Sequence, residues 1–173
     1  MIACVDVDYR EDGAVAACVL IPDWAAERPS AELLQPIAQV APYEPGHFYK
    51  RELPCLLAVL QRVTRPLEAI IVDGYVWLAD ETRPGLGAHL YLALEQRVPV
   101  VGVGKSHFRA VQVAQQVRRG GSDKPLWVTS AGIDCTQAAN HVAAMAGPYR
   151  VPAVLKRVDQ LCRGRGEPAR AEK

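Results

Sequence analysis

The amino-acid sequence predicts an α/β domain whose central sheet mixes antiparallel and parallel strands. IACVDVDY and AVAACVLI are β-rich runs on either side of the short turn REDG, which is the pattern of a β-hairpin. EAIIVDG and VPVVGVG are short apolar runs, typical of strands buried on both faces. A segment with helical spacing lies between them, and a helical connection favours parallel pairing.

Further strands and helices complete the predicted order of elements. ELLQPIAQVA contains a third antiparallel strand, which Pro36 confines to a sheet edge or a bulge because proline has no N–H to donate. AVQVAQQVRR and PLWVTS are the last expected strands. The expected helices cover residues 48–63, the segment from Pro84 through AHLYLALEQR, residues 135–146 and residues 152–162. We expect one domain over residues 1–162, followed by a disordered polar tail over 163–173.

The composition limits the possible classes of protein. Of 173 residues, 50% are hydrophobic and 23% are charged, as in ordinary globular proteins, and the formal net charge of +1 does not by itself indicate a polyanionic partner. The five cysteines form no CxxC pair and three of them lie in apolar runs, so we expect reduced core thiols in a cytoplasmic protein. We expect neither a signal peptide nor a membrane span, since no apolar run approaches about 18 residues.

Three acidic residues stand out by position. Asp6 lies inside the first strand, Asp73 ends the run IIVD, and Glu52 directly precedes the leucines of a helical apolar face. Carboxylates that converge from two strands and a helix form an oxygen site for Mg²⁺ or Mn²⁺, which can activate water in phosphodiester hydrolysis. Each acid also has an ordinary interpretation: turn chemistry for Asp73, an edge position facing water for Asp6, and a salt bridge or a substrate contact for Glu52.

Five ordered motifs cover most of the chain and together carry a family resemblance. They are CVDVDY, PYEPGHFYKRE, IIVDG with RPGLGAHL, VGVGKS, and LWVTSAGID with PYRVPAVLKRVDQL. In this order and spacing they resemble the motifs of the endonuclease V family of inosine-directed nucleases. The resemblance implies a ribonuclease H-like fold in which Asp6, Glu52 and Asp73 hold Mg²⁺, for which Mn²⁺ can substitute.

The same resemblance implies roles for residues outside the acidic set. Lys105 falls on the family lysine, where its ammonium would lie near the scissile phosphate; a solvated loop lysine is the alternative. Tyr43, Pro45 and Gly46 fall on the wedge that helps to hold a deaminated base flipped out, and Gly74 is implied as a further substrate contact. Without the resemblance, PYEPG is simply a strand-to-helix turn.

The sequence departs from the family pattern in three places. The family has small and polar residues and a histidine where residues 75–80 carry Tyr75, Val76 and Trp77, so we expect crowding beside the metal and the base pocket. A family histidine is replaced in Gly132-Ile133-Asp134, and Asp134 either supplies a fourth carboxylate or caps the following helix. The first strand begins at Ile2 without the family's preceding helix, which predicts a weaker grip on the substrate.

The leading interpretation is a metal-dependent endonuclease of the nucleic-acid repair type. It would hydrolyse a phosphodiester near inosine or another deaminated base in DNA or RNA and leave a 3′-hydroxyl and a 5′-phosphate. One alternative is a catalytically weakened relative that binds nucleic acid, and another is a structure-specific ribonuclease H-like nuclease without inosine preference. We expect a monomer whose partner is nucleic acid and which has no membrane association.

Overall fold

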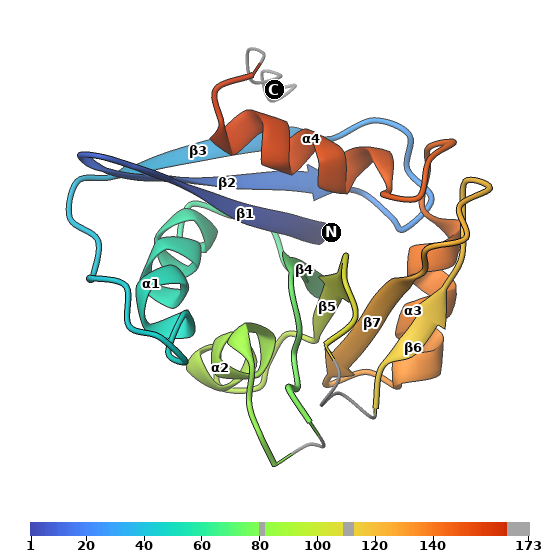
Figure 1. The fold of residues 1–173 in the computed structure, drawn as a ribbon. Helices are drawn as coiled ribbons and strands as arrows, with labels where there is room; N and C mark the ends of the chain where they lie inside the picture. The colour runs from blue at the N-terminus through green and yellow to red at the C-terminus, as the bar shows by residue number, and fades with distance from the viewer. Residues whose placement is uncertain (80–81, 109–112, 166–173) are drawn as a thin grey trace.

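A mixed β-sheet forms the centre of the computed structural model, which describes residues 1–79, 82–108 and 113–165. Within these residues the sheet has seven strands in the order β3-β2-β1-β4-β5-β7-β6 (Figure 1). The strands are β1 (Ile2–Arg10), β2 (Gly13–Ile21), β3 (Ala31–Ile37), β4 (Ala69–Asp73), β5 (Val100–Gly104), β6 (Gln115–Val117) and β7 (Leu126–Ala131). β4 lies parallel to β1 and to β5, and all other neighbours are antiparallel.

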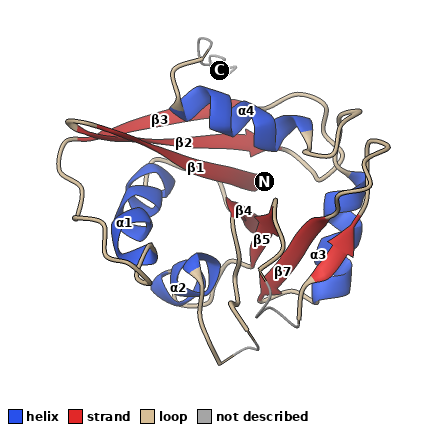
Figure 2. Cartoon of the chain, in the orientation of Figure 1, coloured by secondary structure: helices blue, strands red, loops and turns tan. Residues whose placement is uncertain are grey.

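Helices cover both faces of the sheet (Figure 2). Helices α1 (Tyr49–Leu60) and α2 (Leu86–Ala93) pack on one face, and α3 (Cys135–Ala144) and α4 (Ala153–Cys162) pack on the other. Alternation along β1 serves both layers, because Cys4 joins the core under α3 and α4 whereas Val5 joins the core under α1 and α2.

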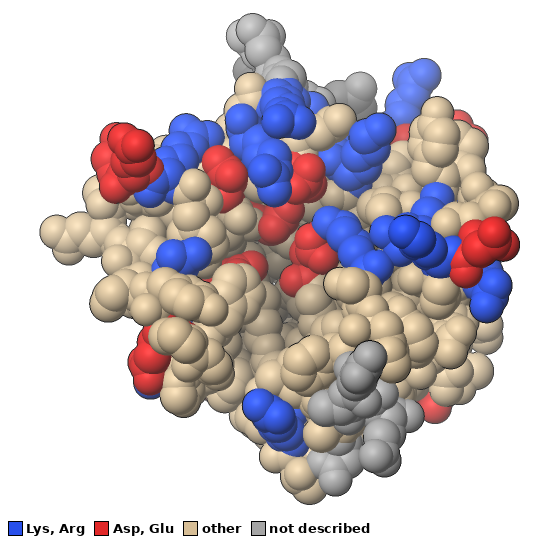
Figure 3. Space-filling view, in the orientation of Figure 1, with Lys and Arg blue, Asp and Glu red and all other residues tan. Residues whose placement is uncertain are grey.

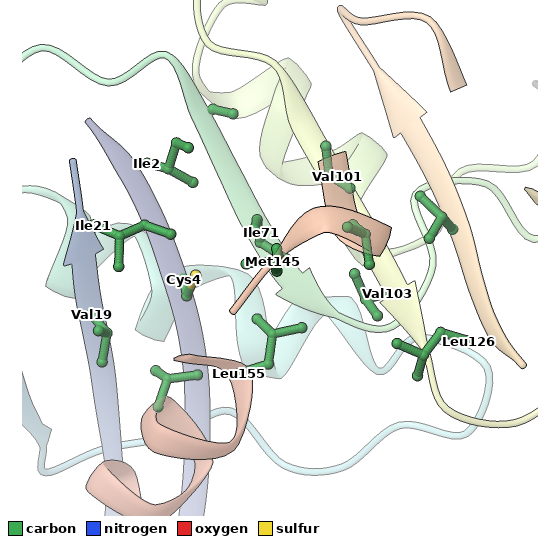
Figure 4. Close-up of a cluster of buried hydrophobic side chains, with 14 of the residues drawn as sticks. Ile2, Cys4, Val19, Ile21, Ile71, Val101, Val103, Leu126, Met145 and Leu155 are labelled. Carbon is green, nitrogen blue, oxygen red and sulfur yellow. The ribbon is translucent and has the colours of Figure 1, made fainter. Parts of the chain in front are cut away.

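The core under α3 and α4 is drawn in Figure 4, where Leu155 lies among side chains from β1, β2 and β4. Its members, including Cys4 and Ile71, are essentially shielded from water. Burial of such a side chain contributes roughly 1.5–3 kcal/mol, so these apolar faces hold the helices on the sheet. Cys4, Cys18 and Cys55 are buried free thiols, which confirms the prediction of core cysteines.

The predicted elements agree with the structure to within a few residues. β3 contains Pro36 and lies at an edge of the sheet, as the missing N–H requires. The strand predicted in AVQVAQQVRR is shorter than expected, because β6 covers only Gln115–Val117 and part of the segment lies outside the described residues. Most of the predicted disordered tail, residues 166–173, also lies outside them. No described helix has both the length and the apolar character needed to cross a bilayer.

Candidate active site

The register of β1 against β4 brings Asp6 and Asp73 together. The two parallel strands pair as far as Val5 with Val72, so the next residue on each strand is one of the two acids. At Asp6, β1 is paired with β2 opposite Ala17 but no longer with β4, and the residue is partly buried. Burial, followed by the charge of Asp73, raises the pKa of Asp6 to about 6, although the Val7 N–H donates to Asp6 Oδ1 at 2.9 Å and opposes this shift.

Glu52 reaches the same place from the first turn of α1. Only 5% of the residue is exposed, and its Oε2 atom is buried without a hydrogen-bond partner among the described residues. Burial and then the charges of Asp6 and Asp73 raise the pKa of Glu52 to about 8, while the charge of neighbouring Arg51 and the nearby Tyr9 hydroxyl oppose the shift. A buried carboxylate oxygen without a donor is unfavourable, so Glu52 is poised to accept a cation or a donor.

Lys105 supplies a positive charge at this end of the sheet. It follows β5 directly, and its Nζ lies 2.5 Å from Oδ2 of Asp73. Burial acts to lower the pKa of Lys105, but the hydrogen bond and charge of Asp73 outweigh it and the pKa is raised. Lys105 is therefore held as an ammonium beside Asp73, with part of its side chain exposed to solvent.

Asp159 is a fourth acid at the site, and the sequence reasoning did not single it out. It lies on α4, and its charge contributes to the raised pKa of Asp6. Arg163 Nε lies 2.8 Å from its Oδ1. The available signal was helical spacing, since Asp159 follows the buried Leu155 by four residues and therefore lies near the same face.

Asp134, which we considered as the fourth carboxylate, has a different contact. Its Oδ1 accepts the Gln137 N–H at 2.9 Å, so it is the N-cap of α3. The structure supports the capping alternative, and the acid whose charge influences Asp6 is Asp159.

The expected crowding by residues 75–77 is only partly present. Val76 is buried and its N–H donates to Thr129 Oγ1, and Trp77 Nε1 donates to the Ser130 carbonyl at 2.9 Å. Only Tyr75 reaches the loop after Lys105, where its hydroxyl donates to the Ser106 carbonyl. The Val76 side chain packs into the core beside Gly87 of α2, and the Trp77 indole is bonded to β7, so the structure places these two side chains away from the turn after Lys105.

The segment PYEPG lies on the surface before α1. Tyr43 is 60% exposed, and the Arg51 guanidinium lies 5.6 Å from its ring centroid. Gly46 has a φ of +80°, which favours glycine, and Pro45 precedes it. Gly74, directly after Asp73, also has a positive φ, of +135°. Tyr43 is thus displayed at the surface, on the α1 side of the acids.

Acidic and basic side chains occupy different parts of this face. Figure 3 shows acidic side chains gathered at the centre of the face, with Lys and Arg side chains on both sides of them. Nucleic acid carries a regular array of negative phosphates, and the flanking cations are side chains that can contact them. A chain of near-neutral net charge can therefore still present a local group of cations on one face.

The donor set suits a hard divalent cation. Asp6, Glu52, Asp73 and Asp159 present carboxylate oxygens, which are the ligands that Mg²⁺ and Mn²⁺ take, and the orphaned Glu52 Oε2 atom would gain a partner. As the side chains lie, no three His, Cys, Asp or Glu residues in the described ranges are close enough to enclose an ion. Asp73 is turned to Lys105 instead, so metal binding requires the carboxylates to move together.

The mixed sheet and its acid-bearing strand ends define a ribonuclease H-like α/β protein. The family model for endonuclease V matches residues 1–133. Over 181 aligned residues the chain is 30% identical to endonuclease V of Streptomyces avermitilis, covering 92% of this chain and 77% of the relative. The Streptomyces coelicolor endonuclease V is also 30% identical, with 92% and 76% of the two chains covered. The chain belongs to the endonuclease V family.

Solved structures agree with this assignment. The crystal structure of the Streptomyces avermitilis endonuclease V matches with a TM-score of 0.76 at 31% identity, over 94% of this chain and 79% of the other. Endonuclease V of Ciona intestinalis (D234N), solved with a 23mer DNA containing an inosine followed by a ribo-adenosine, matches with a TM-score of 0.80 at 17% identity, over 94% and 83% of the chains. At 17% identity, the match to the Ciona intestinalis structure shows a shared fold only.

Proposed function

We propose that this protein is a divalent-metal-dependent endonuclease that hydrolyses a phosphodiester near inosine or another deaminated base in nucleic acid. The observation that carries the proposal is the convergence of Asp6, Glu52 and Asp73 with one carboxylate oxygen of Glu52 buried and unpartnered. Membership of the endonuclease V family supports nuclease chemistry at this site. In this proposal β1 and the end of β4 supply two ligands and α1 supplies the third.

In this proposal Asp6, Glu52 and Asp73 hold Mg²⁺ or Mn²⁺, with Asp159 beside them. The metal, when bound, supplies an activated water and neutralises charge on the leaving oxygen. Burial raises the pKa of Asp6 and of Glu52, so each carboxyl is costly to ionise without a cation beside it. A cation bound between them would therefore interact strongly with both carboxylates. The cluster therefore selects for bound positive charge.

Lys105 acts on the phosphate. Its ammonium is already kept protonated beside Asp73, and it lies at the mouth of the site because about 40% of its side chain is exposed. Negative charge develops on the phosphoryl oxygens during hydrolysis, and a fixed cation stabilises it more in the transition state than in the ground state. If Asp73 held a metal, the Lys105 ammonium would lose its ion-pair partner and would be available to this charge.

Selection of the base involves the exposed turn before α1. Tyr43 provides an aromatic face that can replace lost base stacking, and Pro45 with Gly46 forms a stiff turn that loses little entropy on binding. Gly74 has no side chain beside Asp73, so a sugar–phosphate backbone can approach closely. The Ciona intestinalis enzyme solved with inosine-containing DNA supports this substrate class.

Cleavage of defined oligonucleotides tests the proposal. End-labelled DNA and RNA, each with and without one inosine, are incubated with the wild type, Asp6→Asn, Asp73→Asn and the surface control Asp123→Asn, in Mg²⁺, in Mn²⁺ and in EDTA. We expect metal-dependent cutting beside inosine, lowered at least about 100-fold by the first two substitutions and unchanged by the control. Equal cutting of strands with and without inosine would favour a structure-specific nuclease. Equal activity in Mg²⁺ and in EDTA would contradict the proposed metal dependence.

A further inference from the structure

Tyr75 connects the segment after Asp73 to the turn after Lys105. It lies two residues after Asp73, and its hydroxyl donates to the Ser106 carbonyl at 2.7 Å. The same hydroxyl accepts the Phe108 N–H at 3.3 Å, and the two aromatic rings lie with centroids 6.3 Å apart. One phenol oxygen is therefore hydrogen-bonded to two residues, Ser106 and Phe108, of the turn that directly follows Lys105.

The ring of Tyr75 is itself firmly placed. The backbone carbonyl of Tyr75 accepts the Gly87 N–H at 3.2 Å, which ties the residue to the first turn of α2. The ring also occupies the space beside Gly104, where an added Cβ would lie 2.7 Å from Tyr75 Cζ. Gly104 precedes Lys105, so the missing side chain lets the tyrosine lie flat against the backbone that leads into the lysine.

The carbonyl of Lys105 is held by a different residue. Arg150 Nη1 donates to Lys105 O at 2.9 Å, from the segment before α4. The backbone of Lys105 is thus fixed on one side by Arg150, and the following turn on the other by Tyr75. From this backbone position the Lys105 side chain reaches Asp73 Oδ2.

We propose that Tyr75 is a positioning residue for Lys105: its hydroxyl fixes the turn over residues 106–108 and thereby holds the lysine ammonium where the scissile phosphate binds. Tyr75 does not touch the reacting atoms in this scheme. The catalytic consequence rests on the proposed function, whereas the placement of Lys105 can be measured without any activity.

The variant Tyr75→Phe removes the hydroxyl and keeps the ring against Gly104. Reaction of the lysines with an amine-acylating reagent is followed by mass spectrometry in the wild type, Tyr75→Phe and the control Tyr149→Phe, whose residue is 66% exposed. We expect Lys105 to react roughly fivefold faster in Tyr75→Phe, the population change that corresponds to one neutral hydrogen bond. Lys124 should react equally in all three proteins. An unchanged Lys105 rate with an unchanged melting temperature would overturn the proposal.

Kinetics on an inosine oligonucleotide then separate positioning from direct contact. We expect Tyr75→Phe to lower kcat roughly fivefold to tenfold with KM nearly constant, and to have no further effect in a Lys105→Ala background, because the two residues act in series. Additive losses, or a change confined to KM, would refute a role through Lys105. If the wild type cuts nothing, the proposed function fails, and the acylation rates still decide whether Tyr75 places Lys105.

Discussion

Replacing Glu52 by glutamine should change how the stability of the metal-free protein depends on pH. Glu52 is buried and its pKa is raised from 4.5 to about 8, first by burial and then by Asp6 and Asp73. A carboxyl with a raised folded-state pKa stabilises the fold fully below its unfolded pKa, near 4.5, and loses that contribution as the pH rises through about 8. Glutamine has the same shape and cannot ionise, so it removes this loss.

The size of the effect follows from the shift. Each pKa unit corresponds to about 1.36 kcal/mol, so ionisation of Glu52 in the folded protein can cost up to about 5 kcal/mol above pH 8. Folded domains are commonly stable by about 5–15 kcal/mol, so this is a large part of the total. We expect Glu52→Gln and the wild type to be similarly stable at pH 4.5 and to diverge by several kcal/mol at pH 9.

Urea unfolding in EDTA at pH 4.5, 6, 7.5 and 9 measures this difference, with Glu11→Gln in the exposed β1–β2 turn as the matched control. Parallel curves for Glu52→Gln and the wild type would refute the reasoning that Glu52 is an unpaired buried acid. Addition of Mg²⁺ gives a second reading, because a ligand that binds only the folded state stabilises it by mass action. The gain should increase with pH in the wild type and be much smaller in Glu52→Gln.

Three further substitutions test separate parts of the site. Lys105→Gln should tighten Mg²⁺ binding in calorimetry, since it removes the cation that competes for Asp73, yet lower kcat roughly 100- to 1,000-fold; looser binding would contradict the competition. Asp134→Ala should destabilise the fold by about 1 kcal/mol, visible as a melting temperature lowered by about 2–4 °C, because the cap to Gln137 is lost. Its cleavage rate should stay constant, and a loss of cleavage would revive the metal role. Tyr43→Ala should reduce the preference for inosine over inosine-free strands while leaving the melting temperature unchanged, and an unaltered preference would exclude the wedge role.

The sequence was sufficient to predict the order of the elements and three of the four acids. Period-two alternation, continuous apolar runs and helical spacing are local signals, and each was long enough to be unambiguous for β1, β2 and α1. Asp6 was detectable because it is an acid inside an apolar strand, and Asp73 because it ends an apolar run. Glu52 was detectable because it precedes the leucines of a helix.

Asp159 shows why the remainder of the site was not predictable. On the sequence it is one acid in an amphipathic helix, and acids at such positions usually face water. Its significance comes from α4 packing across β1, which places Asp159 within electrostatic reach of Asp6. That contact spans more than 150 residues and depends on the packing of apolar side chains such as Leu155 and Val158, which no local pattern specifies.

A second buried glutamate in the same chain contrasts with Glu52. Glu32 is also buried, and Arg157 meets both of its carboxylate oxygens, at 2.6 and 2.7 Å. Glu52 has an arginine as its direct neighbour, yet the Arg51 guanidinium lies 3.6 Å from the Tyr9 ring centroid and Glu52 Oε2 stays unpaired. A fold that stabilises one buried carboxylate with a two-point arginine contact has the means to do so for another. An open Glu52 beside Asp6 and Asp73 has no structural benefit, because their like charges oppose ionisation, whereas the attraction of a bound divalent cation would outweigh that repulsion.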